Sequence, residues 1–188
     1  MDKGQDTIEK AARLAARAHR GQTRKESDLP YVVHPFMVAI KLIKYGFSDT
    51  VIAAALVHDV LEDASVTTEE LSDELGNEVA QLVTTITNDD SLPWLEKKKK
   101  YIESVRIGPV EAKAIATADK VHNLESLLIA YETDGNKVWA YFNSGMKDKI
   151  WFEEAMLKML QESWQHPLIK EYESLLSDLK ERIKKSQV

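Results

Sequence analysis

The string HDVLED places four ionisable side chains within six consecutive residues: His58, Asp59, Glu62 and Asp63. The preceding residues 52–57 are all apolar, so the pattern predicts a buried helix that carries these groups. Helical spacings of three and four bring Asp59 near Glu62 and Asp63. Clustered carboxylates are costly to bury without compensation, and a divalent cation held by carboxylate and imidazole ligands would supply it. The alternative is an exposed helix end with a simple His–Glu pair.

A second polar group lies in the string ATADKVHNLESLL, residues 116–128. Asp119, Asn123 and Ser126 follow one another at spacings of four and three, so they share one helix face. His122 lies beside Asp119 on the same side. A plain polar stripe on an amphipathic helix is the alternative, but apolar residues cover much of the remaining helix surface.

A third candidate is His34 in the string YVVHP, directly after a polar loop and at the start of a predicted helix. A lone histidine in such a place is more often structural than a metal ligand. The presence of the two other candidate groups favours the ligand interpretation.

The elements that must position these groups are predicted to be helices, because helical periodicity is nearly continuous and strand signals are almost absent. Only 7 glycines and 5 prolines interrupt the chain. A capping-box pair, Asp6 and Glu9, predicts that the first helix starts there, and Gly21 marks its end. After a loop over 22–33, a second helix begins at His34–Pro35.

The HDVLED string falls in a third predicted helix, which Ser48 caps and which continues through Leu61. Thr67 and Glu70 form a capping box for the next helix, which ends at Gly76. Further helices are predicted over residues 78–87, 94–105, 111–131 and 147–185, the last broken near 166–167.

Length and composition indicate one cytoplasmic domain over residues 1–188. The chain lacks cysteine, which excludes disulfides and thiolate metal sites, and its net charge of −6 does not favour nucleic-acid binding. No signal peptide or membrane-spanning segment is expected. The oligomeric state is left open, with a homo-oligomer as one alternative.

Two other features have more than one interpretation. The run Lys97–Lys100 is typical of a solvated helix face, although it could also steer an anion toward a nearby site. Aromatic residues of the C-terminal third could belong to the core, to a pocket wall or to a subunit contact. They are Trp139, Tyr141, Phe142, Trp151 and Phe152.

The motifs together resemble a known family. The order of His34, His58–Asp59 and Asp119 is similar to the ligand set of the HD phosphohydrolase superfamily. The strings AHRGQTRK, PYVVHP, ALVHDVLED, LPWLEKKK and ADKVHNL, with a TxxEL stretch at 67–71, resemble the hydrolase domain of Rel/Spo stringent-response proteins and the small stand-alone alarmone hydrolases. The likeness covers about residues 11–128, and it implies a compact all-α HD bundle on which C-terminal helices, about 136–188, pack.

The resemblance implies that His34, His58, Asp59 and Asp119 hold one manganese ion per chain. Such a set would leave positions on the metal for water and a phosphate oxygen, and the metal would polarise the phosphoryl group. Glu62 and Asp63 match a pair that the family needs for hydrolysis, in which either could act as the base.

The resemblance also implies a set of substrate-binding residues: Arg24, Lys25, Tyr31, Lys120, Asn123 and Ser126. One departure concerns Ala116, because the family commonly has a lysine at this position. Lys113, one turn earlier, is a candidate substitute for that cation.

The function implied by the resemblance is manganese-dependent hydrolysis of the 3′-pyrophosphate of guanosine 3′,5′-bispyrophosphates, ppGpp and pppGpp, to GDP or GTP and pyrophosphate. Ala116 motivates an alternative, in which the substrate is another phosphorylated nucleotide such as NADPH. A third alternative is an inert HD domain that senses a nucleotide, against which the intact Glu62 and Asp63 argue. From the length we expect no synthetase domain.

Overall fold

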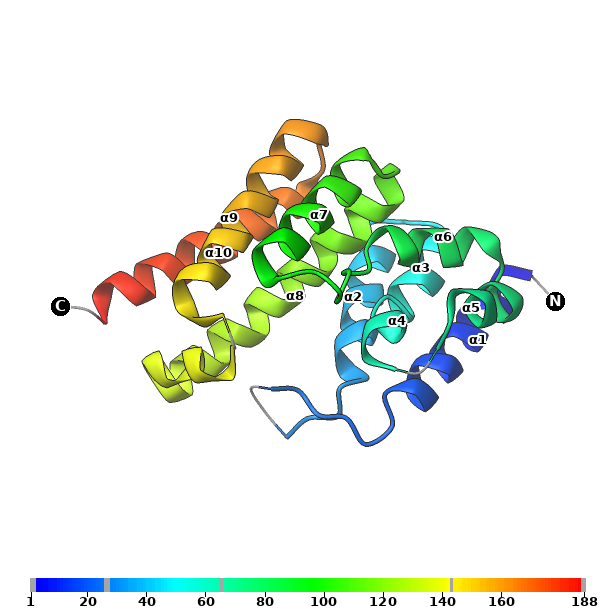
Figure 1. The fold of residues 1–188 in the computed structure, drawn as a ribbon, viewed down its shortest axis with the longest axis horizontal. Helices are drawn as coiled ribbons and strands as arrows, with labels where there is room; N and C mark the ends of the chain where they lie inside the picture. The colour runs from blue at the N-terminus through cyan, green and yellow to red at the C-terminus, as the bar shows by residue number, and fades with distance from the viewer. Residues whose placement is uncertain (1–2, 26–27, 65, 143, 187–188) are drawn as a thin grey trace.

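The fold is all-α, as predicted. The computed structural model describes residues 3–25, 28–64, 66–142 and 144–186 (Figure 1). Within these ranges no β-strand occurs, and the single bridge outside a strand joins Thr23 to Pro30 in the loop before the second helix. None of the helices in this part of the chain is both long and apolar enough to cross a membrane.

The helices follow one another with short connections. Their bounds are α1 Lys3–Ala18, α2 Val33–Lys44, α3 Asp49–Leu56, α4 Val60–Asp63, α5 Thr68–Leu75, α6 Asn77–Thr85, α7 Trp94–Ile107, α8 Val110–Asp134, the 3₁₀ helix η1 Gly135–Tyr141, α9 Gly145–Ser163 and α10 Pro167–Lys185.

Helix α8 is the central element of the arrangement. It contacts α2, α3 and α6 from the N-terminal half and also α7, α9 and α10. Figure 1 shows α8 running between the helices α1 to α6 at one end of the molecule and the pair α9 and α10 at the other. Because α8 touches both groups, a side chain at its middle can meet residues from either half of the chain.

Helix α10 packs along α8 with an apolar stripe. Leu168, Tyr172, Leu176 and Leu179 are buried and recur at spacings of three and four, which is one face of a helix. Pro167 occupies the first turn of α10, where a proline costs no hydrogen bond, and the ring of His166 accepts the N–H of Leu168.

The capping box predicted at Thr67 and Glu70 is confirmed. The Glu70 N–H donates to the Thr67 hydroxyl over 3.2 Å, and the Thr67 N–H donates to the Glu70 carboxylate over 2.9 Å. This reciprocal pair begins α5, which ends before Gly76, whose φ of 93° favours glycine.

The capping box predicted at Asp6 and Glu9 is wrong, because α1 already begins at Lys3. Asp6 therefore lies inside the helix, and the Glu9 carboxylate bonds forward to Arg13 over 2.6 Å. An i,i+4 acid–base pair on an exposed helix face satisfies Glu9 without a cap. The helix also ends at Ala18, before Gly21.

The predicted continuous helix through Leu61 is also wrong, because the chain turns at residues 57–59 between α3 and α4. Val57 N–H bonds to the Ala54 carbonyl at 3.2 Å, a tighter spacing than an α-helix uses. At this turn the carbonyl of Ala55 forms a hydrogen bond with Nδ1 of His58, 2.8 Å away. His58 and Asp59 therefore lie in a turn and not in the unbroken helix that the apolar run predicted.

Candidate metal centre

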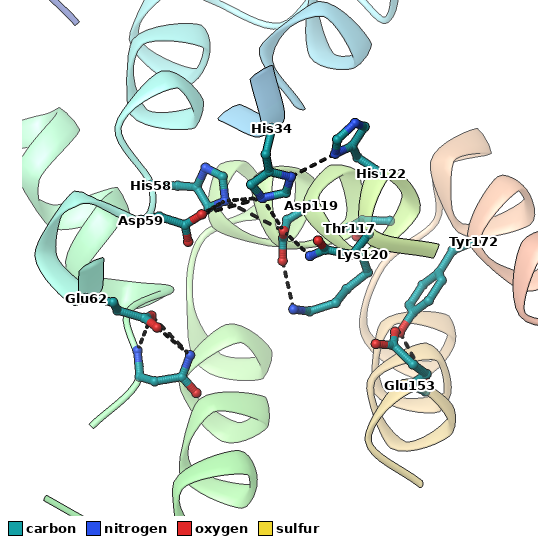
Figure 2. A network of polar contacts seen from close by, with 12 residues as sticks. His34, His58, Asp59, Glu62, Thr117, Asp119, Lys120, His122, Glu153 and Tyr172 are labelled. Carbon is teal, nitrogen blue, oxygen red and sulfur yellow. Dashed lines mark hydrogen bonds and ion pairs between the residues drawn. The ribbon is translucent and has the colours of Figure 1, made fainter. Parts of the chain in front are cut away.

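Four side chains from three parts of the fold converge at the middle of α8 (Figure 2). His34 comes from the first turn of α2, His58 and Asp59 from the turn between α3 and α4, and Asp119 from α8. The Nε2 atoms of the two histidines lie 3.2 Å apart. The ligand atoms of His34, His58 and Asp59 all fall within 4.8 Å of one another, so these three residues could hold a metal ion.

Asp119 lies beside these three residues, with its Oδ1 3.0 Å from Nε2 of His34 and 3.6 Å from Nε2 of His58. Asp59 Oδ2 lies 3.5 and 3.2 Å from the same two nitrogens. Both imidazoles and Asp119 are buried. Two imidazole nitrogens and two carboxylates that converge in a buried site form a donor set suited to a divalent transition metal.

The outward-facing atoms of these side chains are also bound, which fixes their orientation. Nδ1 of His58 contacts the Ala55 carbonyl, so its Nε2 is free to face the cluster. Nδ1 of His34 lies 2.8 Å from Nδ1 of His122. Contacts of this kind orient the histidines of metal sites and set their tautomers. They support a metal-binding role for the cluster.

The carboxylates have outer partners as well. The Tyr31 hydroxyl donates to Asp59 Oδ2 over 2.7 Å. Asp119 accepts from the Asn123 amide over 2.6 Å and from the Lys120 ammonium over 2.7 Å. Three of the predicted substrate-binding residues, Tyr31, Lys120 and Asn123, therefore contact the candidate ligands directly in this structure.

The electrostatics of the cluster reflect burial balanced by opposite charge. Burial alone would lower the pKa of His58, but the Asp59 and Asp119 carboxylates outweigh it and raise that pKa to about 9. Burial would raise the pKa of Asp119, yet Lys120 and the two histidines hold it well below its usual range. The pKa of His34 is lowered by burial despite Asp119. Opposite charges therefore stabilise the ionised form of Asp119.

Glu62 in α4 lies on the far side of the cluster from His122 (Figure 2). Its Oε1 accepts the backbone N–H of Asn88 over 2.6 Å and the Asn88 side-chain amide over 3.0 Å. Burial raises the pKa of Glu62, although the bonds from Asn88 oppose the shift. Asp63 is the last residue of α4, and its side chain lies outside the described part of the structure.

A pocket of about 270 Å³ opens on the other side of the cluster, next to His34 and His122. Arg24 and Ser126 line it. The Arg24 guanidinium donates to Asn123 over 3.0 Å and lies 5.6 Å from the Tyr31 ring centre. The structure thus brings Arg24, Ser126 and Asn123 together, whereas Lys25 is exposed in the preceding loop.

Lys113 does not take the place of the cation that Ala116 lacks. The Lys113 ammonium donates to the Gly108 carbonyl over 2.8 Å, at the start of α8. Ala116 is itself buried, 1% exposed, and carries no polar group. The hypothesis that Lys113 substitutes for a lysine at 116 is therefore wrong.

Sequence reasoning missed Asn88 and Lys98, and it named His122 only as a neighbour of Asp119. Asn88 lies in a loop 26 residues after Glu62, so no local spacing connects the two. Lys98 belongs to the run Lys97–Lys100, where a solvated face was the favoured interpretation; its ammonium instead donates to Asn88 Oδ1 over 3.0 Å. Lysines are common on the surfaces of helices, so nothing in the sequence distinguishes Lys98 from the other lysines of the run.

The fold and this site identify the class of protein: the chain belongs to the HD domain family, whose sequence profile matches residues 11–148. The human protein named guanosine-3′,5′-bis(diphosphate) 3′-pyrophosphohydrolase MESH1 is a relative, 41% identical over 120 residues, or 62% of this chain and 67% of that one.

Two solved structures are similar over most of the chain. The crystal structure of lmo0812 from Listeria monocytogenes EGD-e has a TM-score of 0.73 and 35% identity, covering 78% of this chain and 97% of that one. A structure described as a metazoan ortholog of SpoT that hydrolyses ppGpp has a TM-score of 0.76 and 25% identity, covering 92% of this chain and 94% of that one.

Proposed function

We propose that the protein is a cytoplasmic, manganese-dependent enzyme that hydrolyses the 3′-pyrophosphate of ppGpp and pppGpp, with GDP or GTP and pyrophosphate as products. The observation that carries this proposal is the convergence of His34, His58, Asp59 and Asp119 beside Glu62. The names of the human relative and of the metazoan structure supply the substrate. Both proteins are named or described as acting on this nucleotide.

The two histidines and the two aspartates would hold the metal, which when bound would polarise the phosphoryl group and make water more acidic. Glu62 is the proposed general base. Its carboxylate accepts three hydrogen bonds from Asn88, and burial raises its pKa toward the working range of a base. A water oxygen joins the phosphorus, the bond from phosphorus to the 3′-oxygen breaks, and that oxygen leaves with a proton.

The pocket beside His122 is the proposed nucleoside site. Arg24 offers a planar guanidinium that can stack on a purine face or bind phosphate, and Ser126 offers a hydroxyl to the ribose. Lys120, next to Asp119, is proposed to neutralise phosphate charge. Lys25 is proposed to contact the nucleotide from the exposed loop, and Asp63 to assist Glu62.

The test is pyrophosphate release from ppGpp by metal-stripped protein to which manganese, magnesium or zinc is returned. We expect release with manganese and none from an Asp59→Ala variant under the same conditions. A folded wild-type protein that binds manganese but releases no pyrophosphate from ppGpp would refute the substrate.

The absence of a cation at Ala116 favours one second candidate, another phosphorylated nucleotide such as NADPH. Neither Ala116 nor Lys113 offers a charge at this point of α8. A panel of nucleotides at equal concentration, read as released phosphate or pyrophosphate, separates the two candidates. Turnover of ppGpp alone would reject the second.

A further inference from the structure

Lys98 differs from its neighbours in the lysine run of α7. Lys97 pairs with Asp90 over 2.8 Å, and the exposed Lys100 pairs with Asp89 over 2.7 Å. The Lys98 ammonium instead turns inward and lies 4.8 Å from the ring centre of Phe152 in α9. The run is therefore not one solvated face, because the half-buried Lys98 is directed toward Phe152 and Asn88.

A second cation lies against the same ring. The Lys120 ammonium is 5.1 Å from the centre of Phe152, and Lys98 and Lys120 also lie 6.0 and 5.4 Å from the Tyr101 ring. Lys120 is neutralised by Asp119 at 2.7 Å. Two ammonium groups that share two aromatic rings repel each other unless negative charge lies nearby.

Lys98 has no such ion-pair partner of its own. Its hydrogen-bond acceptor is the neutral side-chain oxygen of Asn88, 3.0 Å away. Across the described residues, no carboxylate lies within ion-pair distance of its ammonium. Half-buried charges without a partner are costly, so this position is built for an anion that comes from outside the chain.

The place of Lys98 indicates which part of a ligand it would meet. Asn88, which accepts from Lys98, also donates to Glu62. Glu62 and His122 lie on opposite sides of the four candidate ligands (Figure 2), and the proposed nucleoside pocket is on the His122 side. A phosphoryl group that extends past the metal centre, away from the nucleoside, would therefore approach Lys98.

We propose that Lys98, together with Lys120, forms a subsite for the distal phosphate of the pyrophosphoryl group that the enzyme releases, and that Lys98 is a substrate-positioning residue. Phe152 and Tyr101 form the wall that holds the two ammonium groups. The identity of the anion rests on the proposed function, whereas the anion subsite itself rests on the contacts of Lys98.

The test is calorimetric titration of inorganic pyrophosphate into the manganese-loaded protein. We expect Lys98→Gln to raise the dissociation constant at least about tenfold, the usual effect of losing one charge-assisted hydrogen bond. Lys98→Met keeps the packing on Phe152 and should behave alike, while Lys98→Arg keeps the positive charge and should bind pyrophosphate more tightly than either neutral variant. The matched control, Lys100→Gln, removes the same charge from the exposed face of the same helix and should change the constant by less than about twofold.

An unchanged constant in Lys98→Gln and Lys98→Met, or an equal loss in Lys100→Gln, would overturn the proposal. Thermal melting accompanies each titration, and Lys98→Gln and Lys98→Met should melt no lower than wild type because they remove a cation that has no ion-pair partner among the described residues. Protein that binds pyrophosphate through Lys98 but does not cleave ppGpp would refute the proposed function alone. Protein that cleaves ppGpp with no role for Lys98 in pyrophosphate binding would refute this inference alone.

Discussion

The Nδ1 atoms of His34 and His122 lie 2.8 Å apart, so one of the two rings must donate its proton to the other. Burial and the neighbouring His34 and Arg24 lower the pKa of His122 to about 4, and its ring is therefore neutral near pH 7. If His34 donates from Nδ1, its Nε2 carries a lone pair toward Asp59 and Asp119. That tautomer is the one a metal ligand needs.

We therefore predict that His122→Phe weakens manganese binding roughly 10- to 100-fold, the range found when an outer partner of a metal ligand is lost. His122→Asn keeps an acceptor near the Nδ1 position and should recover most of the affinity. Manganese titration followed by calorimetry measures both. Equal affinities in the Phe variant and the wild type would show that His122 does not orient His34.

Glu62→Gln should abolish the chemical step and leave manganese binding intact. The amide oxygen of the substituted side chain can still accept from Asn88 but cannot take a proton, so the turnover rate should fall at least about 100-fold. Manganese affinity should change little, because Glu62 is not among the converging ligands. Asp59→Ala, measured in parallel for contrast, should lose both turnover and manganese binding. A large loss of manganese binding in Glu62→Gln would instead make Glu62 a ligand.

Pyrophosphate binding should weaken as the pH rises. Burial and the nearby charge of Lys120 lower the pKa of Lys98 to about 8. Lys97 and Lys149 lower this pKa further, whereas the Glu62 carboxylate raises it. A lysine holds its charge below its pKa, so the free protein loses this cation as the pH passes 8. Pyrophosphate titrations near neutral pH and about one pH unit above the pKa of Lys98 should show this loss of affinity.

The control for this prediction is Lys98→Arg, since a guanidinium stays charged over the whole range. It corrects for the ionisation of pyrophosphate and for the state of the metal. The prediction fails if the Arg variant and the wild type respond equally to pH.

Tyr172→Phe should destabilise the protein by about 1–3 kcal/mol, because it leaves a buried carboxylate short of one donor. Glu153 is fully buried and accepts from the Tyr172 hydroxyl and from Lys149. Urea unfolding gives the free-energy difference. Tyr45→Phe is the matched control, since the Tyr45 hydroxyl bonds to Glu171 at the surface and its loss should cost less than about 0.5 kcal/mol.

We propose that residues 1–188 form one folding unit, with the C-terminal helices as part of its core. A chain that ends at Asp134 would leave the apolar side chains of α8 that α10 now covers exposed to water. We expect it to be unfolded or aggregated by circular dichroism and gel filtration, in contrast to a chain that ends at Ser186. A cooperative, monomeric fold in the shorter chain would contradict this proposal.

The sequence predicted the helical fold and the candidate ligands because both depend on local signals. The strings around His34, His58 and Asp119 have recognisable types and spacings, and the Thr67–Glu70 cap is a four-residue pattern. The turn at residues 57–59 was not predictable from an unbroken apolar run. At that turn Nδ1 of His58 contacts the Ala55 carbonyl, a contact of the folded site that the apolar run does not reveal.

The partners of the site could not be predicted for a related reason. Asn88 bonds to Glu62, and Lys98 bonds to Asn88, across long stretches of sequence, and the sequence does not show which lysine of a run will turn inward. The aromatic residues of the C-terminal third were left with three interpretations. Phe152 belongs to the core, since it is buried within the hydrophobic cluster, and its ring also faces the ammonium groups of Lys98 and Lys120.

The short bond from the backbone N–H of Asn88 to Glu62 gives this protein an internal spectroscopic probe. An amide proton held 2.6 Å, donor to acceptor, from a carboxylate resonates far downfield, and it moves upfield when that carboxylate takes up a proton. The Asn88 amide signal in a ¹⁵N-labelled sample therefore follows the ionisation of Glu62 with pH, without substrate and without any substitution in the site.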